Sequence, residues 1–223
     1  MPNISAIAKT MKMKKLNMPR HMLDELGFGH ADFPQSGGDT RQEFDMLVKL
    51  NDLLSLEQKY AIMERQGCHK SGKMDKESKD FGNKYADKSL AEKLQILSAG
   101  NNAPCMNDDG TKCYALPTDK DAPCVNDDGT ISYAVMCYIH GDESVLDSCH
   151  CLRRNYQEEF LSFAKEHPDK VLSFVQFFCG CCAGHQKHHL QNRLGVNLNL
   201  KSINISSVNT DKGQKRVFVY EIV

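Results

Sequence analysis

The sequence predicts an α+β fold with a helical N-terminal half, an antiparallel sheet with helices, and a C-terminal β-hairpin. Apolar residues recur at helical spacing through the first hundred residues, and a tight Asn-Asp-Asp-Gly turn then precedes a strand-like run. The last segment alternates apolar and polar residues on both sides of "NTDKG". A chain of 223 residues suits one domain with an appendage. We divide it into an N-terminal arm, 1–38, and one cysteine-rich domain, 39–223.

The composition predicts a cytoplasmic protein without a nucleic-acid or membrane partner. The 28 basic and 29 acidic residues nearly cancel, so no net field attracts an anionic polymer or surface. No stretch is apolar for the roughly eighteen residues of a membrane span, and the first twenty residues lack the features of an export signal. Partner choice must therefore come from a local site, for which a small molecule is one candidate partner, and the sequence does not determine the oligomeric state.

The N-terminal half reads as a series of helices. Residues 1–38 form a basic helical arm that ends in the breaker cluster "FPQSGGD", and "TRQEFDMLVKLNDLL" at 40–54 has apolar residues at helical spacing. Ser55 with Gln58, and Ser89 with Glu92, match the capping box that opens a helix. We therefore expect helices over 40–54, from 55 to Gly67, and from 89.

A near-repeat occupies the middle of the chain. "APCMNDDGT" at 103–111 recurs as "APCVNDDGT" at 122–130, and the second copy leads into "ISYAVMCY". Asp-Asp-Gly is a turn signal, so each copy predicts a hairpin-like arm. A calcium loop is not favoured, because the alternating oxygen ligands and terminal Glu are missing.

The second half predicts a helix, a strand, a helix and a hairpin. "LRRNYQEEFLSFAKEH" from Leu152 is helical in pattern and stops before Pro168. The apolar run "KVLSFVQFFC", 170–179, predicts a buried strand. A helix then follows over 183–194, closed by Gly195, and the strands "VNLNLKSINIS" and "KRVFVYEIV" complete the chain.

On this predicted helix the histidines and the core residues point apart. At about 100° per residue, Ala183, Leu190 and Leu194 share a stripe, whereas the histidines lie on the other side. We therefore expect His188 and His189 on a solvated face. His185 stands in the first turn, near the cysteines.

Ten cysteines without an export signal predict reduced thiols that bind metal or react. Cys181 and Cys182 fall where the predicted strand meets a helix N-terminus, whose partial positive charge favours thiolate. Our first hypothesis is a zinc-binding or small-ligand-sensing domain, with an iron–sulfur cluster as the second choice of cofactor. Its metal ligands are Cys149, Cys151, Cys179 and Cys181, with Cys182 or His185 as further ligands.

Three alternatives remain open at this point. Cys182 is a candidate nucleophile with His185 as its base, in a thiol-dependent hydrolase that opens a small heterocycle. Cys181 and Cys182 also suit a redox sensor, for which Cys149 or Cys151 is the better resolving thiol because adjacent cysteines form a strained ring. The last alternative is a structural or interaction role without a site, so whether the protein is an enzyme stays open.

Several short segments resemble a known family. These are "IMERQGCHK" at 62–70, "SLAEKL" at 89–94, "YAVMCY" at 133–138, "FCGCCAGHQKHHLQNRLGVNLNLKSI" at 178–203 and "VFVYEI" at 217–222. The chain resembles an uncharacterised bacterial cysteine-rich family related to 4-vinyl-reductase-type small-molecule-binding domains and distantly to 2-amino-thiazoline-4-carboxylate hydrolases. The resemblance implies an α+β fold with a pocket or metal near Cys179, Cys181 and Gly184, and more weakly near Cys137. Val217 and Gln66 stand where relatives often carry cysteine.

Overall fold

The computed structural model confirms the α+β fold and describes nine ranges of the chain. These are residues 4–11, 19–27, 39–67, 72–99, 105–106, 112–113, 123–137, 150–206 and 214–223. The chain forms two compact units, each assembled from two separate segments. Unit 1 is Met1–Cys68 with Ser144–Gly184, and unit 2 is His69–Glu143 with His185–Val223. The predicted division into an arm, 1–38, and one domain, 39–223, stays a prediction.

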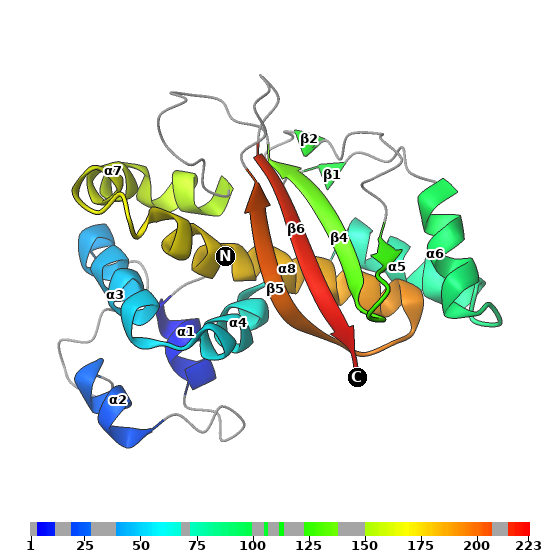
Figure 1. Ribbon diagram of the computed structural model, residues 1–223, viewed down its shortest axis with the longest axis horizontal. Coiled ribbons are helices and arrows are strands. Elements are labelled where there is room, and N and C mark those ends of the chain that lie inside the picture. The colour runs from blue at the N-terminus through cyan, green and yellow to red at the C-terminus, as the bar shows by residue number, and fades with distance from the viewer. Residues whose placement is uncertain are drawn as a thin grey trace. The chain divides into compact units, whose positions relative to one another are not determined.

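Unit 1 is helical in its described parts (Figure 1). Its core contains an aromatic cluster in which the ring of Phe44 lies 5.2 Å from Phe174 and 5.9 Å from both Tyr156 and Phe163. Ile4 and Ile7 are also fully buried, so the first helix of the arm is packed rather than solvated. The elements are α1 (Ile4–Met11), α2 (Arg20–Glu25), α3 (Thr40–Leu53), α4 (Leu56–Met63), η2 (Glu64–Gln66), α7 (His150–Glu166) and the first part of α8 (Val171–Leu194).

Three helix starts have the side-chain caps that shape them. Both predicted capping boxes are confirmed: Gln58 N donates to Ser55 Oγ at 3.3 Å, and Glu92 N donates to Ser89 Oγ at 3.3 Å. In each box the backbone N–H of the serine donates in return to the Gln58 or Glu92 side chain. Asp39 caps α3 by accepting from the N–H groups of Arg41 and Gln42. These local signals place the helices within one residue of the expected starts.

Unit 2 contains helices and a four-stranded antiparallel sheet of order β3-β4-β6-β5. Its elements are α5 (Lys73–Lys84), α6 (Leu90–Ala99), β3 (Cys124–Val125), β4 (Ile131–Cys137), β5 (Leu198–Ser206), β6 (Gln214–Ile222) and the remainder of α8. A separate two-stranded sheet joins β1 (Cys105–Met106) to β2 (Lys112–Cys113). The predicted C-terminal hairpin and both repeat hairpins are confirmed at the level of backbone pairing.

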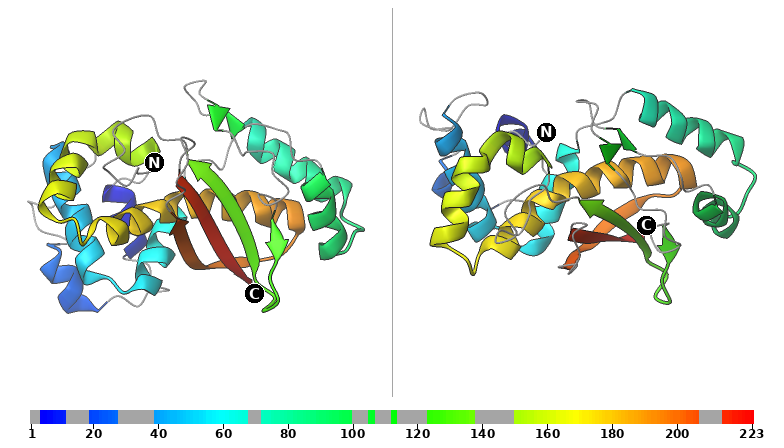
Figure 2. Two further views of the ribbon diagram at one scale, coloured as in Figure 1. Left: turned by 45° about the horizontal axis from the view of Figure 1, so that its top comes forward. Right: turned by 90° about the horizontal axis from the view of Figure 1, so that it is seen from above.

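The sheet has one buried face. Phe218 and Tyr220 on β6 are fully buried, and their partners Ile203 on β5 and Ile131 on β4 are buried with them. The C-terminal part of α8 crosses this face of the sheet in all three views (Figure 1, Figure 2). Side chains alternate between faces along a strand, so Val217 and Val219 point to the other side, where they are half-buried.

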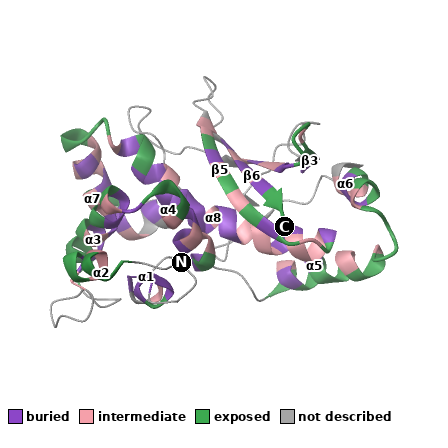
Figure 3. Cartoon of the chain, turned by 60° about the horizontal axis from the view of Figure 1, so that its bottom comes forward, coloured by how far each residue is buried: buried purple, intermediate pink, exposed green. Residues whose placement is uncertain are grey.

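The predicted strand at 170–179 is wrong. The segment is the first part of α8, which runs without interruption from Val171 to Leu194. A short apolar run without clear periodicity fits a helix as well as a strand, and here an apolar residue, Leu172, also occupies the exposed side of the helix. Figure 3 shows buried residues along much of α8, among them Phe174, Phe177 and Phe178. The expected helix over 183–194 is confirmed as the end of α8, with Gly195 at φ 73° beyond it.

The α8 helix is thus the element that both units share, and it carries every histidine and cysteine from 179 to 189. Among the helices within the described ranges, none has the length and apolar character needed to cross a bilayer.

Candidate metal centre

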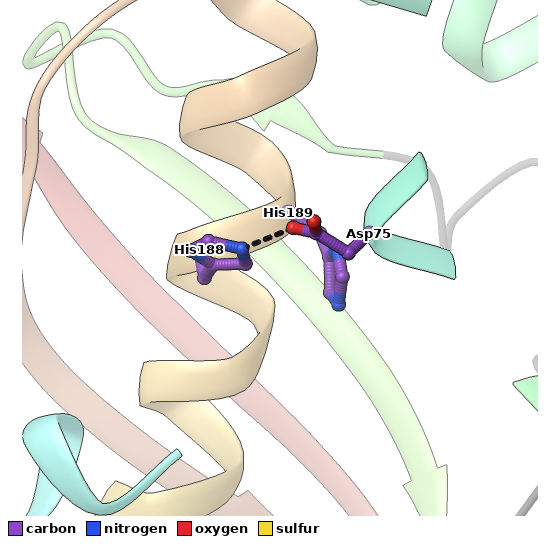
Figure 4. Close-up of side chains that lie close together, drawn as sticks. All are labelled: Asp75, His188 and His189. Carbon is purple, nitrogen blue, oxygen red and sulfur yellow. Dashed lines mark hydrogen bonds and ion pairs between the residues drawn. The ribbon is translucent and has the colours of Figure 1, made fainter. Parts of the chain in front are cut away.

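The candidate site lies in unit 2, where α5 packs beside the C-terminal part of α8 (Figure 4). Asp75 and Ser78 are the buried residues of α5, and they face His188 and His189 of α8. They stand three residues apart, so they occupy one side of α5 and can reach the same neighbour. The rest of α5 carries charged residues, with an i,i+4 ion pair between Lys73 and Glu77 on its exposed surface.

Gly82 allows the two helices to come close. A methyl group at this position would collide with the main-chain carbonyl of Asn192 on α8. Because the obstacle is backbone rather than the end of a flexible side chain, only glycine fits at this contact. Gly82 lies about one turn beyond Ser78 and two turns beyond Asp75, so this close approach brings both short side chains within bonding distance of α8.

Asp75 is the centre of a charged hydrogen-bond network. Its Oδ1 lies 2.6 Å from His188 Nε2, and its Oδ2 accepts from Lys79 Nζ at 2.6 Å. Asn192 Nδ2 is near both partners, 3.4 Å from Asp75 Oδ1 and 3.2 Å from His188 Nε2. The hydrogen bond from Lys79, followed by that from His188, holds the pKa of Asp75 below its usual value. The carboxylate is therefore ionised although only 7% of the residue is exposed.

His189 is held as a neutral ring in one tautomer. It is buried, and its Nδ1 lies 2.9 Å from Ser78 Oγ. The Ser78 hydroxyl donates its single proton to the Asp75 carbonyl oxygen at 2.9 Å, so its oxygen accepts from Nδ1–H of His189. Burial, and then the charges of His188 and Arg193, lower the pKa of His189 to about 4. The lone pair of the neutral ring is therefore on Nε2.

Asp75, His188 and His189 form a group that suits a metal ion. Each offers one ligand atom, and the three atoms lie within 4.8 Å of one another. Two imidazoles and one carboxylate form a donor set typical of zinc and other first-row transition metals, and their residues come from two rigid helices. Figure 4 shows the Asp75 carboxylate between the two rings.

The structure contradicts the predicted solvated histidine face. His189 is buried, and the His188 side chain is only 25% exposed. A helical wheel predicts burial from apolar residues alone, whereas here α5 covers this side of α8 with polar side chains, Asp75 and Ser78. His185 also belongs to this face, with its ring 4.5 Å from that of His189.

α5 is the element that the sequence reading missed, and Asp75 was missed with it. Its signals were weak. Gly72 precedes the helix at φ 99°, and Lys73 with Glu77 and Asp75 with Lys79 make i,i+4 pairs of opposite charge. Such pairs indicate a helix, yet they do not indicate which side of it is buried.

Two of the four predicted cysteine ligands, Cys179 and Cys181, have described side chains, and they point in different directions. Cys179 and Cys181 are both buried in the middle of α8, two positions apart. Residues with this spacing are turned by about 200° around a helix axis, so their side chains leave on nearly opposite sides. Cys181 Sγ lies 3.3 Å from the carbonyl oxygen of Gln66, within unit 1. Cys149 and the side chain of Cys151 lie outside the described residues, so the four-cysteine site stays a prediction.

The expected helix start at Cys182 is wrong, because α8 begins at Val171. The positive end of the helix therefore does not act on Cys181 or Cys182, and the reason for an activated thiolate there is removed. Cys182 is half-buried and, like Cys179 and Cys181, forms no disulfide. The Cys182–His185 pair and the thiol sensor remain untested hypotheses, and Cys137 ends β4 with its side chain outside the described set.

Comparison with known proteins adds no relative. No protein-family model, no curated protein and no solved structure matches the chain. The resemblance to the cysteine-rich family therefore stays a prediction, and the geometry of the site carries the functional argument.

Proposed function

We propose that this protein binds a divalent transition metal, zinc by preference, through Asp75, His188 and His189. The supporting observation is the convergence of three ligand atoms from α5 and α8 to within 4.8 Å. The proposal keeps the metal-binding function expected from the sequence and assigns it to different residues. We place the protein in the cytoplasm, where its thiols stay reduced; Cys179, Cys181 and Cys182, which the structure describes, form no disulfide.

The donor chemistry supports this assignment over the cysteine set. Asp75 is already ionised and His189 is neutral, so neither must lose a proton to bind metal. The Ser78 hydroxyl, itself bonded to the Asp75 carbonyl oxygen, fixes the orientation of the His189 ring beside the other two residues. Cys179 and Cys181, in contrast, leave α8 in opposite directions.

The hydrogen-bonded pair of Asp75 and His188 must open before an ion fits between them. Asp75 Oδ1 and His188 Nε2 lie 2.6 Å apart, as hydrogen-bonded partners do. Ligands of tetrahedral zinc with bonds of about 2.0–2.1 Å are separated by roughly 3.3 Å, so these atoms must move apart by roughly 0.7 Å. A small side-chain rotation is enough for this movement. The ion then takes the place of the hydrogen-bonded proton between Asp75 Oδ1 and His188 Nε2.

Three protein ligands leave one position of a tetrahedral ion open. Structural zinc sites use four protein ligands, whereas sites that bind water or an exogenous molecule use three. The proposed centre is therefore of the open kind, which agrees with a small molecule as the expected partner.

Cobalt(II) titration of the metal-free protein tests the proposal. We expect one equivalent to bind with the visible ligand-field bands of a nitrogen–oxygen site and without the near-ultraviolet band of thiolate coordination. His188→Asn and His189→Asn should each weaken binding by more than the roughly 10–100-fold that loss of an outer-shell partner costs. His185→Asn is the matched control, because it removes an imidazole from the same helix outside the ligand group.

Two results would contradict the proposal. Equal cobalt affinity in the wild-type protein and in both ligand variants would show that the ion binds elsewhere. A strong thiolate band would return the assignment to the cysteines. Zinc competition, followed by calorimetry, then ranks the two metals on the same site.

A further inference from the structure

The repeat in the middle of the chain extends beyond the nine residues that the two copies most clearly share. Residues 103–116, "APCMNDDGTKCYAL", align with 122–135, "APCVNDDGTISYAV", at a constant offset of nineteen. The backbone pairing follows the same offset. Cys105 pairs with Cys113 as Cys124 pairs with Ser132, and Met106 pairs with Lys112 as Val125 pairs with Ile131. The chain thus builds one hairpin twice, in one register.

Within the described ranges, the second hairpin is the one that joins the main sheet. Its β4 strand continues to Cys137 and pairs along its length with β6, from Ile131 opposite Tyr220 to Cys137 opposite Gln214. Within the described residues the first hairpin remains a two-stranded sheet of its own. Since both copies share the sequence Asn-Asp-Asp-Gly-Thr and the same pairing, the difference must come from the residues that differ between them.

Two differences oppose entry of the first copy. Ile131 is fully buried beside Tyr220, and its counterpart is Lys112, whose ammonium group would have to enter the core. Met136 pairs with Lys215 of β6, and its counterpart is Pro117, which has no N–H to donate and is not tolerated inside a sheet.

A third difference concerns the hydrogen bonds that hold the turn of the second copy. Asn126 Nδ2 donates to both Thr130 Oγ1 and Ser132 Oγ at 2.8 Å, which ties the turn to the start of β4. The residue that corresponds to Ser132 is Cys113, and sulfur is a poorer acceptor than a hydroxyl oxygen.

We infer that either hairpin can occupy the position beside β6. Ile131 and Met136 favour the second hairpin there, whereas their counterparts Lys112 and Pro117 disfavour the first. The selection is a conformational device: it excludes a sheet that is shifted by one repeat and otherwise has the same turn and register. If the first hairpin replaced the second beside β6, the connection before the hairpin would become nineteen residues shorter and the connection after it nineteen residues longer. The entropy of loop closure changes only slowly with loop length, so this change costs little free energy. The inference does not depend on the proposed metal function.

Hydrogen–deuterium exchange on two variants tests it. The first variant, Lys112→Ile with Pro117→Met, leaves β4 and β6 unchanged, so its folding is not endangered. We expect two isotope envelopes for peptides covering 131–137, one of them without protection, and a matching protected envelope for 112–118. Lys120→Ile is the control, because it adds the same apolar side chain outside the repeat, and it should keep the single wild-type envelope.

The second variant adds Ile131→Lys and Met136→Pro, which completes the exchange. Protection should then move to 112–118 and disappear from 131–137, while 214–222 stays protected. A single, fully protected envelope at 131–137 in the first variant would overturn the inference. Loss of protection at 214–222 in the second variant would also overturn it, because β6 would then have lost its neighbour without gaining another.

Discussion

His189 shows how a single buried side chain links the candidate site to stability. The ring is neutral because burial lowers its pKa to about 4, and Ser78 fixes which nitrogen carries the proton. In the unfolded chain the same ring titrates near 6.5. Between these two values the unfolded state binds more protons than the native state, so acidification favours unfolding.

The metal-free protein should therefore lose stability as the pH falls from about 6.5 toward 4. Between pH 7 and pH 5 the contribution of His189 is about 2 kcal/mol, with the stability fully present above the unfolded pKa. Urea unfolding at the two pH values measures it in wild type and in His189→Asn, whose amide can still donate to Ser78. The variant should lose less stability than wild type over this interval. An equal loss in both proteins would show that His189 titrates normally.

At the scale of elements, glycines in the helices determine how closely neighbours approach. Within unit 1, a methyl group on Gly184 of α8 would collide with the backbone carbonyl of Glu64 in η2, and one on Gly180 would meet Met63 Cβ. Within unit 2, Gly82 has the corresponding role against Asn192. Glycine costs helix stability by about 1 kcal/mol relative to alanine, so its presence at these contacts reflects packing.

Gly184→Ala and Gly82→Ala should both destabilise the protein, although alanine is the better helix former. The added methyl group meets main-chain atoms that cannot rotate away, and overpacking of this kind costs about 1–3 kcal/mol or more. Asp80→Ala, at an exposed position of α5, is the control and should change stability by less than about 0.5 kcal/mol. Chemical unfolding provides the comparison. A gain in stability for either glycine variant would mean that the helices can separate freely.

The elements also show what the sequence could predict. Ser55, Ser89 and Gly195 act on their own neighbours, so their helix ends were predicted from local chemistry. The hairpins were predicted for the same reason. Residues 170–179 were assigned wrongly, because Leu172 is apolar although it is exposed, and this blurs the periodicity that separates helix from strand. The Asp75–His188 contact joins residues 113 positions apart and depends on α5, whose two buried residues, Asp75 and Ser78, are both polar.

At the scale of the molecule, each unit is built from two separated stretches of chain. Unit 1 needs residues from before and after the segment 69–143, and unit 2 needs that segment together with the residues beyond Gly184. The core of unit 1 illustrates this, since Phe44 from α3 meets Phe174 from α8. Neither unit therefore corresponds to a contiguous segment that could be expressed alone.

A cut between 143 and 144 should give two fragments that are unfolded separately and fold together. Fragment 1–143 lacks α7 and α8, and it also lacks β5 and β6, so it cannot complete either core. Amide NMR spectra of each fragment, and of the equimolar mixture, provide the measurement. Dispersed native-like signals from fragment 1–143 alone would contradict the expectation, and the uncut chain is the reference.

The shared α8 helix also sets the order of events during translation. The first segment of unit 1 leaves the ribosome well before residues 144–184 are made, a delay of roughly ten seconds at ordinary elongation rates. Throughout this interval the apolar side of α3, including Phe44 and Leu47, has no native partner from α8 to cover it. We expect chaperones that bind exposed apolar segments to bind the nascent chain during this interval. Synonymous changes that slow decoding between 69 and 143 lengthen the interval and should therefore reduce the soluble yield.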